Sequence, residues 1–526
     1  MRKIEIYDTT LRDGTQGSGV NFTVEDKLKI IQKLDELGVD YIEAGYPAAS
    51  GLDRDVFARL RDRKLSTSRI VAFGSTRAKA TRPEDSGSLT AIVESGAPIA
   101  AVFGKSWTLH VCEVLRTTRE ENLRMIEDSV RFLRSHGLVV FYDAEHYFDG
   151  YAADSEYALE TLRAALSAGA ERLVLCDTRG GTVRRELARI YEETATRINA
   201  LYGIHTHNDS GLAIANSLSA VELGASQVQG TINGYGERCG NANLCILIPL
   251  LTLKLGMETI PRRNLILLTE TARFVSEVAN LPMDERQPFV GAHAFAHKAG
   301  MHSDGVLKNH ESFEHIDPAL VGNERGILVS HLAGRAAVAE CVRRYVDAID
   351  KRDNSISELL EEIERRTAEG YEYEDAEGSF ELLVMKKFGK HRDLFERCGF
   401  RVIIDRREDG SMYAEASIKI RVGDEVIHTA AEGNGPVDAL DRALRKALSE
   451  IYPQIKTISL VDYKVRVLNS ESGTAAKVRV FIESTDREHQ WGTVGVSENI
   501  MEASWQALLD SIEYGLLYKQ ARRAGT

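Results

Sequence analysis

From residue 3 to about residue 255, short β-branched and apolar runs alternate with longer stretches whose apolar positions recur every three or four residues. This pattern is typical of repeated βα units, because buried parallel strands read as short apolar runs and amphipathic helices repeat every 3.6 residues. A helical stretch follows each strand, as residues 24–37 do with Thr23 as the expected N-cap. The predicted strands are residues 3–8, 39–44, 69–73, 98–103, 138–143, 172–176, 202–206 and 227–231.

Eight βα units predict an α/β fold, a closed (β/α)8 TIM barrel over residues 1–255. Polar clusters follow the predicted strands, and in a barrel all of these loops meet at one mouth. An open doubly wound sheet would instead gather its polar residues at one switch point. The clusters are DTTLRDG, EAGYP, DAEHYFDG, CDTRGGT, HTHND and NGYGERCGNANL.

The remaining chain divides into two further parts. Residues 256–375 read as a mostly helical linker region, with the Gly- and His-rich passage GAHAFAHKAGMHSDG. From residue 376 strand-like alternation returns, and the segment repeats itself at an offset of 64, so that Thr429 matches Thr493 and Ala439 matches Ala503. We expect residues 376–526 to form an α+β regulatory or dimerisation domain of two βββα repeats with paired helices.

Composition narrows the functional class. Hydrophobic residues at 43% and charged residues at 28% are ordinary for a globular protein. A formal charge of -13 disfavours nucleic acid and anionic membranes as partners. The six cysteines form no CxxC pair, and no segment has the length of a signal peptide core or a membrane span. We therefore expect a cytoplasmic protein with reduced thiols.

His205 and His207 are the strongest metal candidates. They stand two apart on a predicted strand, so both imidazoles face the barrel interior near the mouth. Asp13 after the first strand supplies a carboxylate, and Asn241 after the eighth supplies an amide oxygen. Such nitrogen and oxygen ligands suit Zn²⁺, Mn²⁺, Co²⁺ or Mg²⁺. The alternative is a pair of hydrogen-bonded core histidines.

Three further charged residues lie at predicted loop or strand ends. Arg12 places a cation beside the predicted metal, which favours a role in stabilising an oxyanion, although a surface salt bridge is the alternative. Glu43 and Glu145 end the second and fifth strands, and we expect them to face the cavity as partners of Arg12 or of a catalytic water. Either glutamate could instead be purely structural.

The segments DTTLRDG, IEAGYP, CDTRGGT, HTHNDSGLA and NGYGERCGNANL, in this order, resemble the acyl-CoA Claisen-condensing synthases of the DRE-TIM metallolyase superfamily. TAAEGNGPVDALDRALRKAL and TVGVSENIMEASWQALLDSI resemble the regulatory domain of 2-isopropylmalate and citramalate synthases. DTTLRDGTQGSGVNF, DAEHYFDGY and HKAGMHSDG are most similar to the citramalate synthases. That resemblance implies condensation of acetyl-CoA with pyruvate to (R)-citramalate, opening a route to isoleucine.

The resemblance also implies residue roles. The metal ligands fall on Asp13, His205 and His207, with Asn241 as a weaker fourth. Arg12 matches the arginine that binds the substrate carboxylate and the oxyanion, and Glu145 matches the catalytic glutamate. His302 and Asp304 match the linker residues that complete acetyl-CoA activation. Thr178 matches the threonine that touches the keto acid. Many relatives read DTNGGT, a hydrophobic residue and proline where this chain has Arg179, Val183 and Arg184.

Two turns in the C-terminal repeats are candidate effector contacts. Gly433-Asn434-Gly435 and Ser497-Glu498-Asn499 precede the predicted helices, whose N-termini offer N–H groups to a carboxylate. The resemblance implies isoleucine as the effector and a homodimer, whereas the alternative is a purely dimerising domain. For the whole chain the rivals are a 2-isopropylmalate synthase acting on 2-ketoisovalerate, more distantly a homocitrate synthase, and a non-catalytic amino-acid sensor.

Overall fold

A computed structural model describes residues 2–61, 63–298, 300–327, 335–343, 352–406, 408, 410, 412–468, 476–487 and 489–524. The chain divides into two compact units. The first comprises Met1–Phe295 and Ile316–Arg325, and the second comprises Ala296–His315 and Gly326–Thr526. Residues of the predicted linker region therefore belong to both units, and its limits of 256 and 375 stay a prediction.

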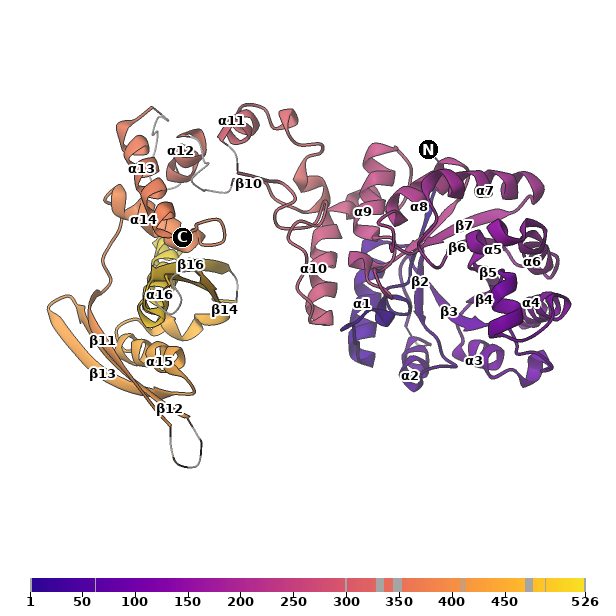
Figure 1. The fold of residues 1–526 in the computed structure, drawn as a ribbon, viewed down its shortest axis with the longest axis horizontal. Coiled ribbons are helices and arrows are strands. Elements are labelled where there is room, and N and C mark those ends of the chain that lie inside the picture. The colour runs from indigo at the N-terminus through magenta and orange to yellow at the C-terminus, as the bar shows by residue number, and fades with distance from the viewer. Residues whose placement is uncertain are drawn as a thin grey trace. The chain divides into compact units, whose positions relative to one another are not determined.

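The first unit contains a closed barrel of eight parallel strands (Figure 1), in which β1 pairs with both β2 and β8. All eight predicted strands are present, with ends that differ by one or two residues. The (β/α)8 fold is confirmed. The strands are β1 (Glu5–Asp8), β2 (Tyr41–Gly45), β3 (Arg69–Ser75), β4 (Ile99–Lys105), β5 (Val139–Glu145), β6 (Arg172–Asp177), β7 (Leu201–Thr206) and β8 (Gln227–Gly230).

Helices surround this barrel (Figure 1). Thr23 caps the first of them as expected, since its side chain accepts a hydrogen bond from the Asp26 N–H in a capping box. One large apolar core includes buried side chains of both strands and helices, and a smaller cluster of inward-facing aromatic and aliphatic side chains fills the barrel. The helices are α1 (Val24–Leu37), α2 (Gly51–Leu60), α3 (Gly87–Ser95), α4 (Arg119–Ser135), α5 (Tyr147–Ala153), α6 (Ser155–Ser167), α7 (Arg184–Arg197), α8 (Ala213–Glu222), α9 (Leu244–Pro249) and α10 (Leu268–Ala279).

The short segment Ile316–Arg325 is part of the first unit although the residues on both sides of it belong to the second. The Thr269 hydroxyl donates to the Val321 carbonyl at 2.7 Å. The buried Asn323 amide donates to the carbonyls of Phe289 and Gly291 at 2.9 Å each. These bonds attach the segment to the end of the barrel unit.

The second unit begins with small elements and ends in the predicted repeats. Each repeat folds as a three-stranded antiparallel sheet followed by a helix, and the two helices share one buried core. The two βββα repeats are therefore confirmed. The elements are β9 (Ala296–His297), α11 (Gly300–Lys308), β10 (Gly326–Ile327), α12 (Arg335–Arg343), α13 (Asn354–Glu369), α14 (Glu377–Lys387), β11 (Glu396–Arg406), β12 (Met412–Val422), β13 (Glu425–Gly433), α15 (Pro436–Leu448), β14 (Ser459–Val467), β15 (Val478–Thr485), β16 (Gln490–Ser497) and α16 (Ile500–Ala524).

One feature of the C-terminal region differs from the expectation. Alternation was expected to begin at residue 376, but Glu377–Lys387 is the helix α14 and the first strand begins only at Glu396. Phe380, Leu382 and Leu383 are all buried, and a short run buried on several sides carries no period that separates strand from helix.

Two observations bear on the class of the protein. Among the described residues, no helix has both the length and the apolar character that crossing a bilayer requires. Five cysteines are free thiols: Cys112, Cys176, Cys239, Cys245 and Cys398.

Candidate active site

The barrel mouth brings together the three predicted metal ligands. The His205 Nε2 atom lies 3.2 Å from Asp13 Oδ2, the His207 Nε2 atom lies 3.8 Å from the same oxygen, and the two Nε2 atoms are 3.3 Å apart. All three side chains are buried. Asn241 forms an isolated β-bridge with His207, so the fourth predicted residue stands beside the other three.

These side chains fit a divalent cation. Bonds of 2.0–2.2 Å to one ion place adjacent ligand atoms about 3.0–3.4 Å apart, which two of the three distances match. Asp13 Oδ1 and Asn241 Oδ1 are buried without any hydrogen-bond partner, as expected of oxygens that are available to a cation. The His205 Nδ1 atom lies 3.0 Å from the Gln229 Oε1 atom, a contact that leaves Nε2 free as a ligand.

Electrostatics keep His207 and Asp13 in the protonation states that metal binding needs. Burial lowers the pKa of His205, but the hydrogen bond and charge of Asp13 outweigh burial and raise it, so a cation would have to displace the His205 proton. Burial, followed by the charge of His205, lowers the pKa of His207 to about 3, so its imidazole is neutral. Burial alone would raise the pKa of Asp13, but Arg12 and His205 outweigh burial and hold that pKa well below its ordinary value. A neutral imidazole beside an ionised carboxylate is the combination that a divalent cation requires.

Arg12 is held by a buried acidic partner. Its Nε atom donates to Glu43 at 2.6 Å, and its NH1 atom lies 3.2 Å from Asp13 Oδ2. Glu43 is fully buried and also accepts hydrogen bonds from the hydroxyls of Tyr7, at 2.6 Å, and Thr9. Burial lowers the pKa of Arg12, but Glu43 and Asp13 more than compensate and raise it above the ordinary value. The guanidinium is thus a permanent cation in a fixed orientation.

A cavity of about 250 Å³ opens above the three predicted ligands. One wall is aromatic, since Phe73 and Phe103 stack with ring centroids 5.2 Å apart and Tyr46 meets Phe73 edge-on at 5.6 Å. The Arg12 guanidinium lies 3.8 Å above the Phe73 ring. The lining residues are Arg12, Asp13, Gln16, Tyr46, Phe73, Phe103, Asp143, Glu145, Cys176, Thr178, His205, His207 and Glu237.

Glu145 and Thr178 both line this cavity, as predicted for residues at strand ends. Both Glu43 and Glu145 were candidate partners of Arg12. Glu43 forms the ion pair with Arg12, whereas Glu145 forms one with Lys105. The Thr178 hydroxyl oxygen accepts the N–H of His146 at 2.9 Å.

Sequence reasoning missed Phe103, Lys105 and Asp143 at this site. Phe103 pairs with Asp143 and Lys105 with Glu145 across β4 and β5, so all four side chains follow the same inward-facing alternation. Counting back by two from Glu145 would have found Asp143. Burial, followed by the charge of Glu43, raises the pKa of Asp143 to about 7, and its Oδ1 atom has no hydrogen-bond partner.

The predicted linker residues lie on α11 in the second unit. His302 is exposed and stacks on Phe313 with ring centroids 4.4 Å apart, and Asp304 pairs with Lys308. Their place in catalysis stays a prediction.

The two predicted effector turns stand at the N-termini of α15 and α16. The Asn434 N–H donates to Asp438 at 2.8 Å and the Asn499 N–H donates to Ser497 at 3.1 Å, so part of each turn is already hydrogen-bonded. Gly435 has open space where a Cβ atom would stand.

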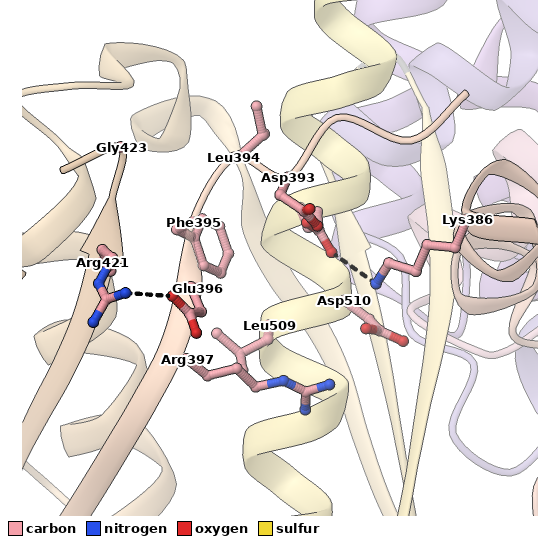
Figure 2. A pocket seen from close by; sticks show the side chains of 11 residues that line it. Lys386, Asp393, Leu394, Phe395, Glu396, Arg397, Arg421, Gly423, Leu509 and Asp510 are labelled. Atoms are coloured by element: carbon pink, nitrogen blue, oxygen red, sulfur yellow. Dashed lines mark hydrogen bonds and ion pairs between the residues drawn. The ribbon is translucent and has the colours of Figure 1, made fainter. Parts of the chain in front are cut away.

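A larger cavity of about 540 Å³ lies within the second unit (Figure 2). Leu394, Phe395 and Leu509 supply its apolar surface, whereas its charges are largely paired: Arg421 lies 3.2 Å from Glu396 and Lys386 lies 3.3 Å from Glu513. Leu509 and Asp510 belong to the C-terminal motif TVGVSENIMEASWQALLDSI, and none of the lining residues belongs to the barrel motifs. The smaller cavity at the barrel mouth is therefore the better candidate for catalysis.

Family models cover nearly the whole chain. The HMGL-like model matches residues 3–275, the homocitrate synthase post-HMGL domain-like model matches residues 289–370, and the LeuA allosteric (dimerisation) domain model matches residues 374–516.

Curated relatives match over similar lengths. The chain is 50% identical over 517 residues to an (R)-citramalate synthase of Aquifex aeolicus and to one of Geobacter sulfurreducens, with 98% of each chain covered in both cases. A probable 2-isopropylmalate synthase of Methanopyrus kandleri is 32% identical over 511 residues, covering 97% of this chain and 98% of that one.

Proposed function

This chain belongs to the (R)-citramalate synthase family, and we propose that its barrel mouth condenses acetyl-CoA with pyruvate to give (R)-citramalate and CoA. The convergence of Asp13, His205 and His207 beside Arg12 in one small cavity is the observation that carries the proposal. Release of free CoA from acetyl-CoA on addition of pyruvate tests it. A non-catalytic sensor would have no use for this set of residues.

At the acceptor, the substrate pyruvate presents a carboxylate and a ketone. A divalent metal ion held by Asp13, His205 and His207, with Asn241 beside them, supplies Lewis-acid polarisation of the ketone when bound. Arg12 is fixed by Glu43 so that its guanidinium faces the cavity, where it stabilises the negative charge that develops on the ketone oxygen. Thr178, on the same rim, contacts the keto acid.

At the donor, a base must remove one methyl proton of acetyl-CoA so that the resulting carbanion attacks the keto carbon. We assign this base to His302, oriented by Asp304, because histidine is the most common general base in enzymes. The alkoxide takes up a proton from water, and the protonated base returns its proton to solvent. Water finally hydrolyses the thioester, releasing CoA and a carboxylate, and Glu145 is placed on the cavity rim to direct that water.

We expect His302→Ala to lower kcat by about 10²–10⁴-fold, the usual contribution of a general base. Metal content should not change, because the predicted metal ligands are on other elements. Steady-state kinetics and metal analysis of the full-length protein measure both. His310→Ala, which changes another exposed histidine, is the matched control. If the two variants had the same kcat, His302 would not be the base.

Pyruvate as the acceptor follows from the family, because the (R)-citramalate synthases are more similar to this chain than the 2-isopropylmalate synthase is. The aromatic wall of Phe73, Phe103 and Tyr46 bounds a cavity of about 250 Å³ that also has to admit the acetyl group. A branched 2-keto acid adds two methyl groups to pyruvate, and each misplaced carbon costs about 1–3 kcal/mol in a hydrophobic pocket. We therefore expect this aromatic wall to set the choice between pyruvate and 2-ketoisovalerate.

Regulation is the proposed function of the repeats. We infer that isoleucine binds at the helix N-termini formed by Gly433-Asn434-Gly435 and Ser497-Glu498-Asn499, where N–H groups and helix dipoles favour a carboxylate. The match of residues 374–516 to an allosteric dimerisation domain supports this, and it supports a homodimer. We also infer that the enzyme works in the cytoplasm, where reduced thiols and its two substrates coexist.

Gly435→Asp should abolish inhibition by isoleucine while leaving turnover nearly intact, because it puts an anion where the effector carboxylate would lie. The fold should tolerate the change, since space is open there and Asp is a good N-cap. Gly435→Asn, of the same size without the charge, should keep more of the inhibition. If the unmodified enzyme showed no isoleucine binding by calorimetry and no inhibition at millimolar isoleucine, the regulatory assignment would fail.

A further inference from the structure

An aromatic and cationic shelf lies beside the catalytic cavity. It consists of Trp107, His110, His146 and Arg179. The rings of Trp107 and His110 stack with centroids 5.2 Å apart at an interplanar angle of 19°, and the rings of His110 and His146 are 4.2 Å apart. The Arg179 guanidinium lies 5.6 Å from the centroid of the Trp107 ring. No step of the reaction proposed above uses any of these four residues.

The shelf is continuous with the cavity rim. Glu145 and Thr178, which line the cavity, directly precede His146 and Arg179 in the chain. The His146 N–H donates to the Thr178 hydroxyl at 2.9 Å, which links the ends of β5 and β6. A molecule whose reactive end lies in the cavity could therefore extend over the shelf.

Close packing fixes the shelf in place. A Cβ atom at Gly150, on α5, would stand 2.4 Å from the carbonyl oxygen of Ser106 and 3.1 Å from the Cα atom of Trp107. The segment after Trp107 continues into a π-helical turn, His110–Val114, and such turns are frequent at functional sites. On this segment Leu109 is 41% exposed and Val114 is 59% exposed, so exposed apolar side chains stand next to the shelf.

The cations on and near the shelf favour an anionic ligand, and its rings favour a ligand with a planar nucleobase. The Arg179 side chain is 60% exposed, although it also pairs with Asp149 at 3.1 Å. The Lys79 ammonium donates to the carbonyls of Leu115 and Arg116 just after the π-helical turn, which adds a second cation at this side of the mouth. Aromatic faces bind nucleobases by stacking, and guanidinium and ammonium groups bind phosphates.

We propose that this shelf binds the adenosine-phosphate end of acetyl-CoA, with the base on the Trp107 and His110 rings and phosphate oxygens at Arg179. The proposal rests on the function proposed above, because that function requires a CoA thioester whose acetyl group reaches Glu145. The rival interpretation is that the four side chains only pack the loops against α5.

The test compares acetyl-CoA with acetyl-pantetheine, which has the same thioester but no nucleotide. Trp107→Ala should raise the KM for acetyl-CoA by about 5- to 150-fold, the range for loss of one stacked base. Its KM for acetyl-pantetheine, its KM for pyruvate and its kcat should stay as in the unmodified enzyme. Trp107→Phe keeps an aromatic face and should recover most of the affinity. Arg179→Gln should raise the KM for acetyl-CoA and leave the KM for acetyl-pantetheine unchanged. Arg184→Gln, which changes another arginine of the same loop region, should change neither KM.

Direct binding separates failure of the shelf from failure of the proposed function. The other two tryptophans, Trp491 and Trp505, are 3% and 2% exposed, so quenching of the fluorescence by adenosine 3′,5′-bisphosphate would report on Trp107 even without turnover. Calorimetry with the same probe should show binding to the unmodified enzyme and much weaker binding to Trp107→Ala. Equal affinities in the two proteins, or equal losses with acetyl-CoA and acetyl-pantetheine, would overturn the proposal.

Discussion

Replacing His207 by alanine is expected to remove both the bound divalent metal and the activity. His207 provides one of three strongly ligating side chains in this cluster, and burial lowers its pKa to about 3, so its neutral imidazole can ligate a cation. Lewis-acid activation contributes several kcal/mol to such a reaction, so turnover should fall by about 10³-fold or more. The fold should survive, because the Nδ1 atom of His207 has no hydrogen-bond partner to lose.

Elemental analysis measures the loss of bound metal, and a thiol-release assay measures the loss of kcat. His136→Ala is the matched control, since this exposed histidine is the C-cap of α4 and its ring contacts Phe132 and Ser135 of that helix. Metal-depleted unmodified enzyme should be equally inactive and should recover when a divalent cation is returned. Full turnover in a metal-free sample would show that the reaction does not require a metal.

Arg12→Gln is expected to reduce kcat by about 10²–10³-fold, the usual loss when a group that stabilises an oxyanion is removed. It should also destabilise the barrel by about 3–5 kcal/mol, because Glu43 is fully buried and would lose its charged partner. Urea unfolding measures the free energy of unfolding, and steady-state kinetics measures kcat.

A second variant separates these two effects. Arg12→Gln combined with Glu43→Gln removes the buried unpaired carboxylate, so the double variant should regain most of the lost stability. Its kcat should stay about 10²–10³-fold below that of the unmodified enzyme, since the cation is still missing. A double variant that regained both stability and turnover would mean that Arg12 only balances the charge of Glu43.

Much of the barrel and of its metal cluster could be predicted from sequence because both depend on local periodicity. Buried parallel strands read as apolar runs, which placed all eight strands to within one or two residues. The period of two along a strand placed His205 and His207 on one face, and their convergence with Asp13 follows from the shared mouth.

The Lys105–Glu145 ion pair, the aromatic wall and the helix α14 could not be predicted, because they depend on strand register and packing that the pattern of a single segment does not show. The ion pair of Lys105 with Glu145 follows from the register of β4 against β5, and Lys105 lies past the apolar run that marked the end of the predicted strand. The aromatic wall at Phe73 and Phe103 likewise joins neighbouring strands. The helix α14 was missed because its apolar run is buried on several sides and shows no single period.

Release of CoA from acetyl-CoA with a panel of 2-keto acids tests the central claim most directly. With a divalent cation present, pyruvate should give the highest kcat/KM, exceeding 2-ketoisovalerate by about 10-fold or more. Phe103→Ala, which shortens the aromatic wall, should narrow that preference. Metal-dependent CoA release with pyruvate as the best acceptor is the predicted result, and a higher kcat/KM for 2-ketoisovalerate, or no CoA release with any keto acid, would contradict it.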